Sequence, residues 1–228
     1  MKNVLFLATV VALASARAAV EFATPFGDGM VLQRDRPVPV WGAANAGATV
    51  EVRFADQVKA AVADSNGSWK ATLDPMPASK VGRALTVREV TNGRDARSTR
   101  ESETQLSDVL VGEVWIVSGQ SNCELPLVGK HPHFGDREGI MTANMTHRPF
   151  IRFAYASTYR YSLEPRTELR ERAVWKEFNP KNLMDAPSFS AMGVYFALAV
   201  ESEIQVPVGL IGVYWGGTRI EPWIPVEA

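Results

Sequence analysis

The sequence predicts an α/β protein in which an N-terminal antiparallel β-sandwich is followed by a parallel α/β domain. Short stretches of alternating apolar and polar residues, separated by turn residues, occupy residues 20–105. Across residues 106–228, continuous apolar stretches and one long amphipathic stretch take over, which is typical of a parallel sheet covered by helices. The boundary between the two domains is therefore expected at residues 105 and 106.

The first 19 residues have the layout of a secretory signal peptide. Lys2 precedes an apolar stretch over residues 4–14, and the small residues that follow allow cleavage after Ala16, Ala18 or Ala19. The apolar stretch is shorter than the roughly 20 residues needed to span a bilayer, which argues against a membrane anchor. We therefore expect a secreted or periplasmic protein.

The composition indicates an ordinary globular protein, with 46% hydrophobic and 21% charged residues in a chain of 228. Its formal net charge of −1 provides no basic surplus for nucleic acid, and no cluster of lysine and arginine suggests a membrane surface. A small molecule or a neutral polymer is the expected partner. The single cysteine, Cys123, excludes an internal disulfide framework.

The sandwich strands are predicted from alternation with a period of two residues. Asn66-Gly67 and Asn92-Gly93 mark turns between them, and residues 91–105 are expected to form a late hairpin and a linker. No sustained helical period occurs in this part of the chain. The apolar positions that alternate are Val50, Val52 and Phe54, then Trp69, Ala71 and Leu73, and finally Leu85 and Val87.

The α/β domain is predicted from two apolar stretches that flank a helix. Residues 108–117 and 208–215 read as buried strands, the first covered on both faces, and residues 150–156 as another strand candidate. Ser188 or Ser190 can cap the helix, and Pro207 ends the helical segment. One apolar face of the helix is predicted to contain Met192, Tyr195, Phe196, Ala199 and Val200.

The stretch "VSGQSNCE" places Ser121 just after the first apolar strand of the α/β domain. Reactive groups in such sheets collect where the carboxyl end of a strand passes into a loop or helix. Ser121 can therefore be a nucleophile, or it can simply cap a short helix. Cys123 occupies the position of the second glycine in the Gly-x-Ser-x-Gly elbow, so the pattern differs from that of α/β-hydrolases.

The stretch "VYWGGTRIEPW" has two glycines directly after the last apolar strand. Their backbone N–H groups can form an oxyanion site, or Gly216 and Gly217 can form a plain turn. These two readings stay open on local pattern alone.

Together, "DVLVGEVWIVSGQSN" and "FSAMGVYFALAVESEIQVPVGLIGVYWGGTRIEPW" resemble the sialate O-acetylesterase family, serine esterases of the SGNH-hydrolase type. The segment "FGDGMVLQRDRPVPVWGAANAGATVEV" is similar to the opening of the N-terminal β-domain of that family. The resemblance implies an SGNH-type α/β domain and a carboxylic ester hydrolase that removes O-acetyl groups from sugars, without a cofactor or metal.

Site residues follow from the resemblance by motif position. Ser121 matches the nucleophile that forms an acetyl-enzyme. The backbone N–H groups of Ser121 and of Gly216 or Gly217 match the oxyanion donors, and Gln120 and Asn122 are expected to orient the turn.

Two departures from the family pattern affect these expectations. Cys123 replaces a common methionine and is expected to pack under the turn. The family's Gln-Gly-Glu and Asp-x-His blocks lie C-terminal to the Trp-Gly-Gly-Thr motif, so the α/β domain is expected to be incomplete and truncated before the catalytic histidine. His131, His133 and His147 lie between the two motifs, where none matches a family base or forms a convincing zinc pattern. Glu221 fits a rim or substrate contact rather than a triad position.

Three alternatives to an active sialate-type enzyme remain. The chain can be a non-catalytic carbohydrate-binding fragment that uses the same cleft. It can also be an esterase of the acetylxylan type, because the sugar is not specified by the motifs. A third possibility is a truncated product that is unstable by itself.

Overall fold

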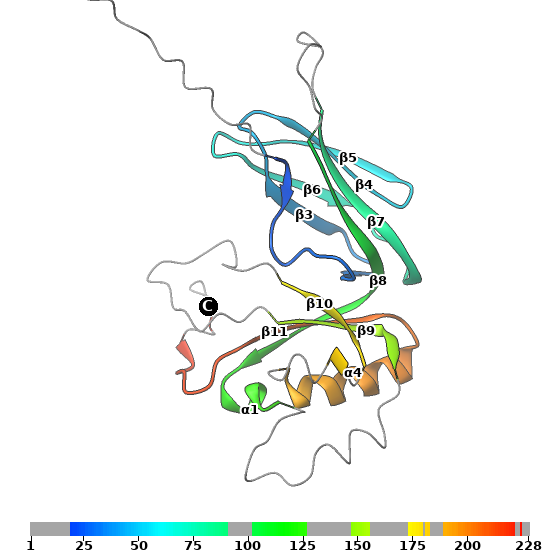
Figure 1. The fold of residues 1–228 in the computed structure, drawn as a ribbon, viewed down its shortest axis with the longest axis vertical. Helices are drawn as coiled ribbons and strands as arrows, with labels where there is room; N and C mark the ends of the chain where they lie inside the picture. Colours follow the sequence, from blue (N-terminus) through cyan, green and yellow to red (C-terminus); the bar gives the residue numbers. More distant parts are fainter. Residues whose placement is uncertain are drawn as a thin grey trace, which may run out of the picture.

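A computed structural model describes residues 19–90, 102–126, 147–155, 173–179, 181–182, 189–221 and 224 of the chain. An N-terminal pair of β-sheets lies against a smaller α/β part, and one long strand, β8 (Glu103–Gly119), runs through both (Figure 1). The signal-peptide prediction for residues 1–19 falls almost entirely outside the described residues, as does the Asn92-Gly93 turn.

The N-terminal part is a β-sandwich, as the alternation predicted. One sheet has the order β1-β3-β6, and β5, β4 and β7 form the other together with β8. Strand β6 buries every second residue, so that Trp69, Ala71 and Leu73 face the core while their neighbours face solvent. The bounds are β1 Glu21–Phe22, β3 Val38–Ala43, β4 Thr49–Phe54, β5 Gln57–Val62, β6 Ser68–Leu73 and β7 Ser79–Val90.

Strand β8 connects the sandwich to the α/β part without a break. Its first half pairs antiparallel with β7, and its middle pairs parallel with the short strand β2 (Val31–Gln33). Glu103 already lies in this strand, so the segment expected to be a linker contributes its last residues to a long hairpin. The predicted domain boundary at residues 105 and 106 therefore lies inside β8.

The second half of β8 enters a sheet in which three neighbouring strands are parallel, as predicted. Strand β11 (Val208–Tyr214) lies between β8 and β9 (Arg148–Tyr155), parallel to both, and β10 (Trp175–Phe178) adds an antiparallel edge. The expectation that β8 is covered on both faces is wrong for its second half. In this half of the strand, the side chains of Trp115 and Ile116 are 44% and 68% exposed.

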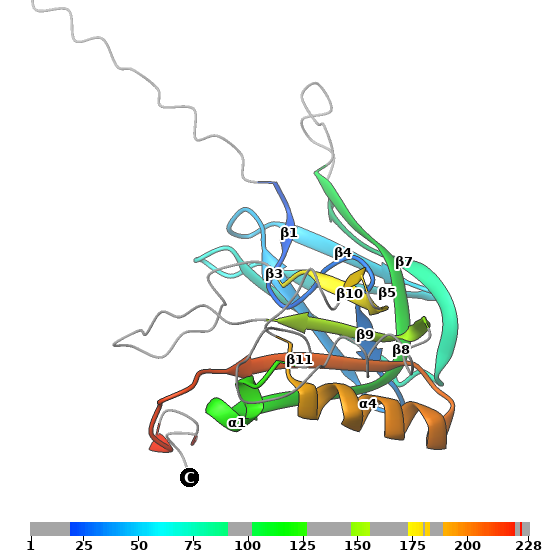
Figure 2. The same cartoon turned by 60° about the horizontal axis from the view of Figure 1, so that its bottom comes forward.

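Helix α4 (Ala191–Ile204) lies along one face of this sheet, as Figure 2 shows from below. Ser190 caps the helix, since its hydroxyl oxygen accepts a hydrogen bond from the Gly193 N–H at 3.2 Å. Gln205, in the left-handed conformation, follows the last turn, and Pro207 lies two residues further on.

The face of α4 that packs on the sheet differs from the predicted apolar face. Met192, Tyr195 and Phe196 are 53%, 56% and 39% exposed, so this part of the prediction is wrong. The buried face instead includes small residues because the helix lies close to the sheet: a Cβ on Gly193 would lie 3.0 Å from a Val117 methyl. The buried residues are Gly193, Val194, Ala197 and Glu201.

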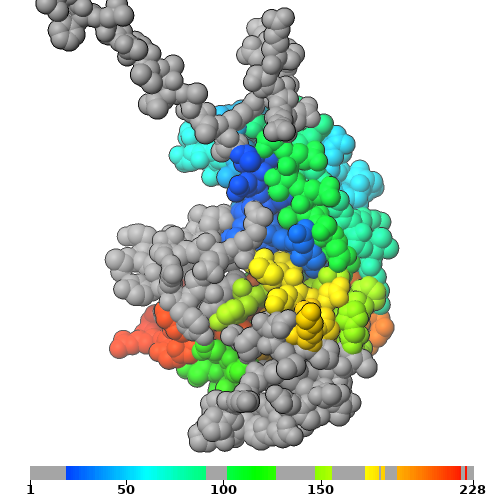
Figure 3. All heavy atoms as spheres, viewed as in Figure 1, coloured from blue at the N-terminus to red at the C-terminus, as the bar shows by residue number. Residues whose placement is uncertain are grey.

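Two clusters of buried side chains form the core. The larger fills the sandwich and extends to Ala154 and Trp175 of the α/β part, and the smaller lies between the parallel strands and α4. In the space-filling view the two parts form a continuous surface (Figure 3). Within the described residues, no helix combines the length and the apolar character that crossing a bilayer requires.

Candidate functional site

Ser121 lies at the carboxyl end of β8, as the first residue of the four-residue helix α1 (Ser121–Glu124). Gly119 makes the turn between strand and helix with a φ of +144°, which side chains rarely allow. A Cβ on this glycine would also lie 2.8 Å from the Cys123 sulfur. The turn that presents Ser121 therefore depends on a glycine at this position.

The Ser121 side chain is exposed and does not cap the helix. Gln120 occupies the N-cap position without a side-chain cap, and its carbonyl oxygen accepts from the backbone N–H groups of Cys123 and Glu124. The Ser121 hydroxyl donates to the side-chain oxygen of Gln120 at 3.2 Å. The alternative that Ser121 caps the helix is therefore wrong, since Gln120 occupies the cap position. Gln120 contacts the hydroxyl directly, while Asn122 is exposed beside it.

Cys123 packs under the turn, as expected. Its thiol donates to the Ser118 carbonyl oxygen at 3.1 Å, and its side chain contacts the smaller core cluster. The second glycine of the hydrolase elbow is replaced here by a side chain that fills space beneath Gly119.

The Gly216-Gly217 turn lies beside Ser121, although about 95 residues separate the two in sequence. Parallel pairing brings them together, since Tyr214 at the end of β11 is in register with Gly119 at the end of β8. The Trp215 N–H then donates to the Gly119 carbonyl oxygen at 3.0 Å and extends the pairing into the turn. The two motifs of the sequence thus meet at one edge of the sheet.

The two glycines of this turn have different surroundings. The Gly216 N–H donates to a carboxylate oxygen of Glu124 at 2.5 Å, and a Cβ on Gly216 would collide with that oxygen. Gly217 has a φ of +78° and is exposed, with no atom within 4 Å of the position that a Cβ would take. Sequence reasoning gave Glu124 no role, although its place three residues after Ser121 in a short helix puts it next to the site.

His147 lies at the other end of the sheet from Ser121. It forms a 2.8 Å contact with Glu177 and precedes β9, whereas Ser121 follows β8. Tyr155 and Val117 are both in register with Gly212, so His147 and the end of β8 are separated by ten residues along the parallel strands. At the usual rise per residue this is roughly 30 Å, too far for a base acting on Ser121.

Three further residues, His131, His133 and Glu221, were candidates in the sequence. His131 and His133 lie outside the described residues, and Glu221 is exposed after the glycine turn. No group of three or more potential metal ligands among His, Cys, Asp and Glu occurs in the described part of the chain.

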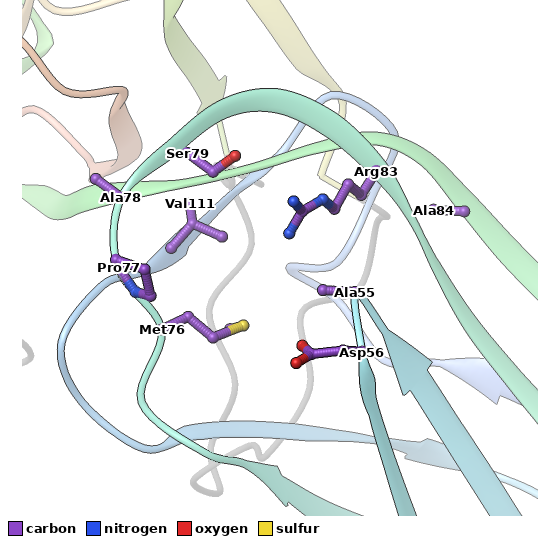
Figure 4. Close-up of a pocket in the computed structure, with 9 residues that line it drawn as sticks. All are labelled: Ala55, Asp56, Met76, Pro77, Ala78, Ser79, Arg83, Ala84 and Val111. Atoms are coloured by element: carbon purple, nitrogen blue, oxygen red, sulfur yellow. The ribbon is translucent and has the colours of Figure 1, made fainter.

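The sandwich has an open depression of about 820 Å³, drawn in Figure 4. Met76 and Val111 line its apolar side, and the side chains of Arg83 and Asp56 point into it. Val111 is ten residues before Ser121 on the chain, and no residue of α1 or of the Gly216-Gly217 turn lines the depression. It is therefore separate from the nucleophile turn.

Comparison with known proteins identifies the family. The chain is 29% identical to human sialate O-acetylesterase in an alignment 229 residues long, which covers 92% of this chain and 39% of that protein. The rat sialate O-acetylesterase is 27% identical, with 96% of this chain covered. A crystal structure of XAC1771, a carbohydrate acetylesterase from Xanthomonas citri, matches 91% of this chain with a TM-score of 0.73 and 32% identity. The chain belongs to the sialate O-acetylesterase family.

The match covers only part of the length of each relative. The chain spans about 40% of the length of the curated relatives and 43% of the Xanthomonas structure. No protein-family model matches the sequence. The strand-rich mixed sheet with few helices matches the fold of the Xanthomonas carbohydrate acetylesterase.

Proposed function

We propose that the protein is a carbohydrate O-acetylesterase in which Ser121 is the nucleophile. The observation that supports this most directly is the meeting of the two motifs at one sheet edge, where the turn after β11 lies against the turn after β8. Curated relatives named sialate O-acetylesterase and a carbohydrate acetylesterase of known structure support the same reaction class.

In the proposed reaction, the Ser121 oxygen bonds to the carbonyl carbon of an O-acetyl group. The bond between that carbon and the sugar oxygen breaks, and the sugar hydroxyl leaves with a proton. Water then attacks the acetyl-serine, which releases acetate and restores the hydroxyl. Backbone N–H groups of Ser121 and of the Gly216-Gly217 turn donate to the oxyanion, and one such donor typically contributes about 3 kcal/mol.

Neither Gln120 nor His147 is placed to act as the general base of this reaction. The Gln120 amide oxygen accepts a hydrogen bond from the serine, but an amide is too weak a base to remove its proton. His147 is paired with Glu177 at the opposite end of the strands. Gln120 is therefore assigned to orienting the hydroxyl until the base receives its proton.

The substrate class is an O-acetylated sugar or glycan. The name of the curated relatives suggests acetylated sialic acid, whereas the Xanthomonas relative is named only for carbohydrate acetyl esters. An acetylated xylan is the second candidate within this class. The signal-like residues 1–19 favour export, and the net charge of −1 makes nucleic acid or an anionic membrane surface a poor partner.

The test is acetate release by the full-length protein with Ser121→Ala. We expect the substitution to lower kcat at least 1,000-fold, because it removes the atom that accepts the acetyl group. Ser118→Ala is the matched control, since Ser118 is also an exposed serine and lies at the end of β8, three residues before Ser121. Comparing acetylated sialic acid, acetylated xylan and 4-nitrophenyl acetate would identify the substrate.

Acetate release that Ser121→Ala leaves unchanged would contradict the assignment. Binding of acetylated sugar without any hydrolysis by the wild-type protein would instead support a non-catalytic carbohydrate-binding role.

A further inference from the structure

Glu124 is a carboxylate in contact with the candidate oxyanion turn. It ends helix α1, three residues after Ser121, and its carboxylate accepts the Gly216 N–H at 2.5 Å. The contact joins the turn after β8 to the turn after β11 and is partly buried. A hydrogen bond from an N–H to an ionised carboxylate is about twice as strong as one between neutral groups.

The contact with Glu124 requires a glycine at position 216. A Cβ at this position would collide with the Glu124 carboxylate and would lie 3.5 Å from the Cα of Ser121. The Gly216 peptide therefore lies close to both the acid and the nucleophile backbone. The Trp215 N–H donates to the Gly119 carbonyl oxygen, and the Gly216 N–H donates to Glu124. Hydrogen bonds therefore hold the turn at two successive residues.

The same contact decides which glycine can serve an oxyanion. An N–H has a single proton, and that of Gly216 is donated to a group that is already negatively charged. An oxyanion at the same N–H would lie beside this carboxylate and be repelled by it. The neighbouring Gly217 N–H has no acceptor among the described residues, and the space around its α-carbon is open.

We infer that Glu124 is a positioning residue: its carboxylate holds the Gly216 amide and thereby leaves the Gly217 amide to donate to the oxyanion formed on Ser121. The inference rests on the proposed esterase function. It predicts that Glu124 acts in the transition state, where the oxyanion exists, rather than in substrate binding.

The kinetic test uses 4-nitrophenyl acetate and the full-length protein. Glu124→Ala should lower kcat about 10- to 100-fold while KM changes less than about threefold, because a displaced Gly217 amide loses most of one donor. Glu124→Gln keeps an acceptor oxygen of the same shape and should retain kcat within about fivefold of the wild type. Glu203→Ala, at an exposed glutamate of α4, is the control and should leave both parameters unchanged.

A second measurement does not depend on activity. In amide NMR spectra, Glu124→Ala should move the Gly216 proton resonance upfield by more than any other glycine amide, because its charged acceptor is removed. Glu124→Gln should move it less. An unmoved Gly216 resonance in Glu124→Ala would overturn the inference.

The kinetic outcomes separate this inference from the proposed function. Suppose that the wild type is active, that Ser121→Ala is inactive, and that Glu124→Ala has an unchanged or raised kcat. This result would overturn only the positioning role of Glu124. Activity that persists in Ser121→Ala would overturn the proposed function. A large rise in KM at constant kcat would also contradict the inference, because it would assign Glu124 to substrate binding.

Discussion

Gly119 and Cys123 show how closely the nucleophile turn is packed at the scale of single residues. The backbone of Gly119 has a φ of +144°, and its α-carbon lies against the sulfur that fills the space beneath the turn. The glycine in "SGQS" could be predicted to permit a tight turn, because no other residue adopts such backbone angles readily. Its contact with Cys123 could not be predicted, since it depends on the direction that helix α1 takes.

We predict that Gly119→Ala lowers the free energy of unfolding by about 1–3 kcal/mol, because backbone strain and a steric clash add up. Gly47→Ala is the control: Gly47 also has a positive φ, of +74°, but no atom lies within 4 Å of its Cβ position. Its cost should be smaller, about 1 kcal/mol. Urea unfolding of both variants tests this, and equal costs would show that the contact with Cys123 is unimportant.

The junction of β2 with β8 is stabilised by a small polar network at the scale of secondary-structure elements. Arg34, which follows β2, donates to Glu113 of β8 at 2.6 Å, and the Gln33 amide donates to the other carboxylate oxygen at 3.2 Å. The hydrogen bond from Arg34 lowers the pKa of Glu113 below its ordinary value, although burial opposes the shift. The network lies where β8 passes from the sandwich into the parallel sheet.

Because the folded protein holds the Glu113 proton less tightly than the unfolded chain, this network stabilises the fold above the ordinary glutamate pKa of about 4.3. The contribution is lost as the pH falls below that value and through the lowered pKa. We therefore expect Glu113→Gln to be less stable than wild type at pH 6, with a smaller difference at pH 3. Urea unfolding at both pH values measures it, with Glu103→Gln, an exposed glutamate of the same strand, as the control. A difference that stays constant with pH would contradict the ion-pair explanation.

Arg152 links the two parts of the protein at the scale of the whole molecule. Its side chain is only 8% exposed and forms ion pairs with Asp108 of β8 at 2.8 Å and with Glu177 of β10 at 3.2 Å. Its Nε also donates to the Pro149 carbonyl oxygen. The large core cluster crosses the same junction, so sandwich and α/β part share both apolar and polar contacts.

We expect Arg152→Met to destabilise the protein by about 1–3 kcal/mol. Methionine keeps the apolar stem in place, while Asp108 and Glu177 are exposed enough to regain water, which limits the loss. Arg53→Met removes an exposed ion pair with Glu51 and should cost less than about 1 kcal/mol. Thermal unfolding monitored by circular dichroism compares the two, and a loss for Arg152→Met no larger than for Arg53→Met would contradict the role of Arg152 as a link.

Local pattern was sufficient to predict those elements whose signal lies within a few residues. Alternation located β4, β6 and β7. Of the two candidate caps, Ser190 is the one that caps the helix, and the helix ends before Pro207 as predicted. The two motif turns lie at strand ends, as expected. The predicted apolar face of α4 was wrong because both sides of that helix are apolar. Which side is buried depends on how closely the helix packs against Val117, and the missing side chain of Gly193 leaves room for a Val117 methyl group.

The sequence alone therefore determined strands β4, β6, β7, β8, β9 and β11, helix α4 and the two turns that carry the candidate site, because backbone preferences and hydrophobic period act locally. Only the tertiary structure decided that β8 is one strand shared by both parts, that His147 lies far from Ser121, and that Glu124 takes the Gly216 amide. These features arise from strand register between segments up to about 100 residues apart, and no local pattern of residues encodes which backbone groups will meet there.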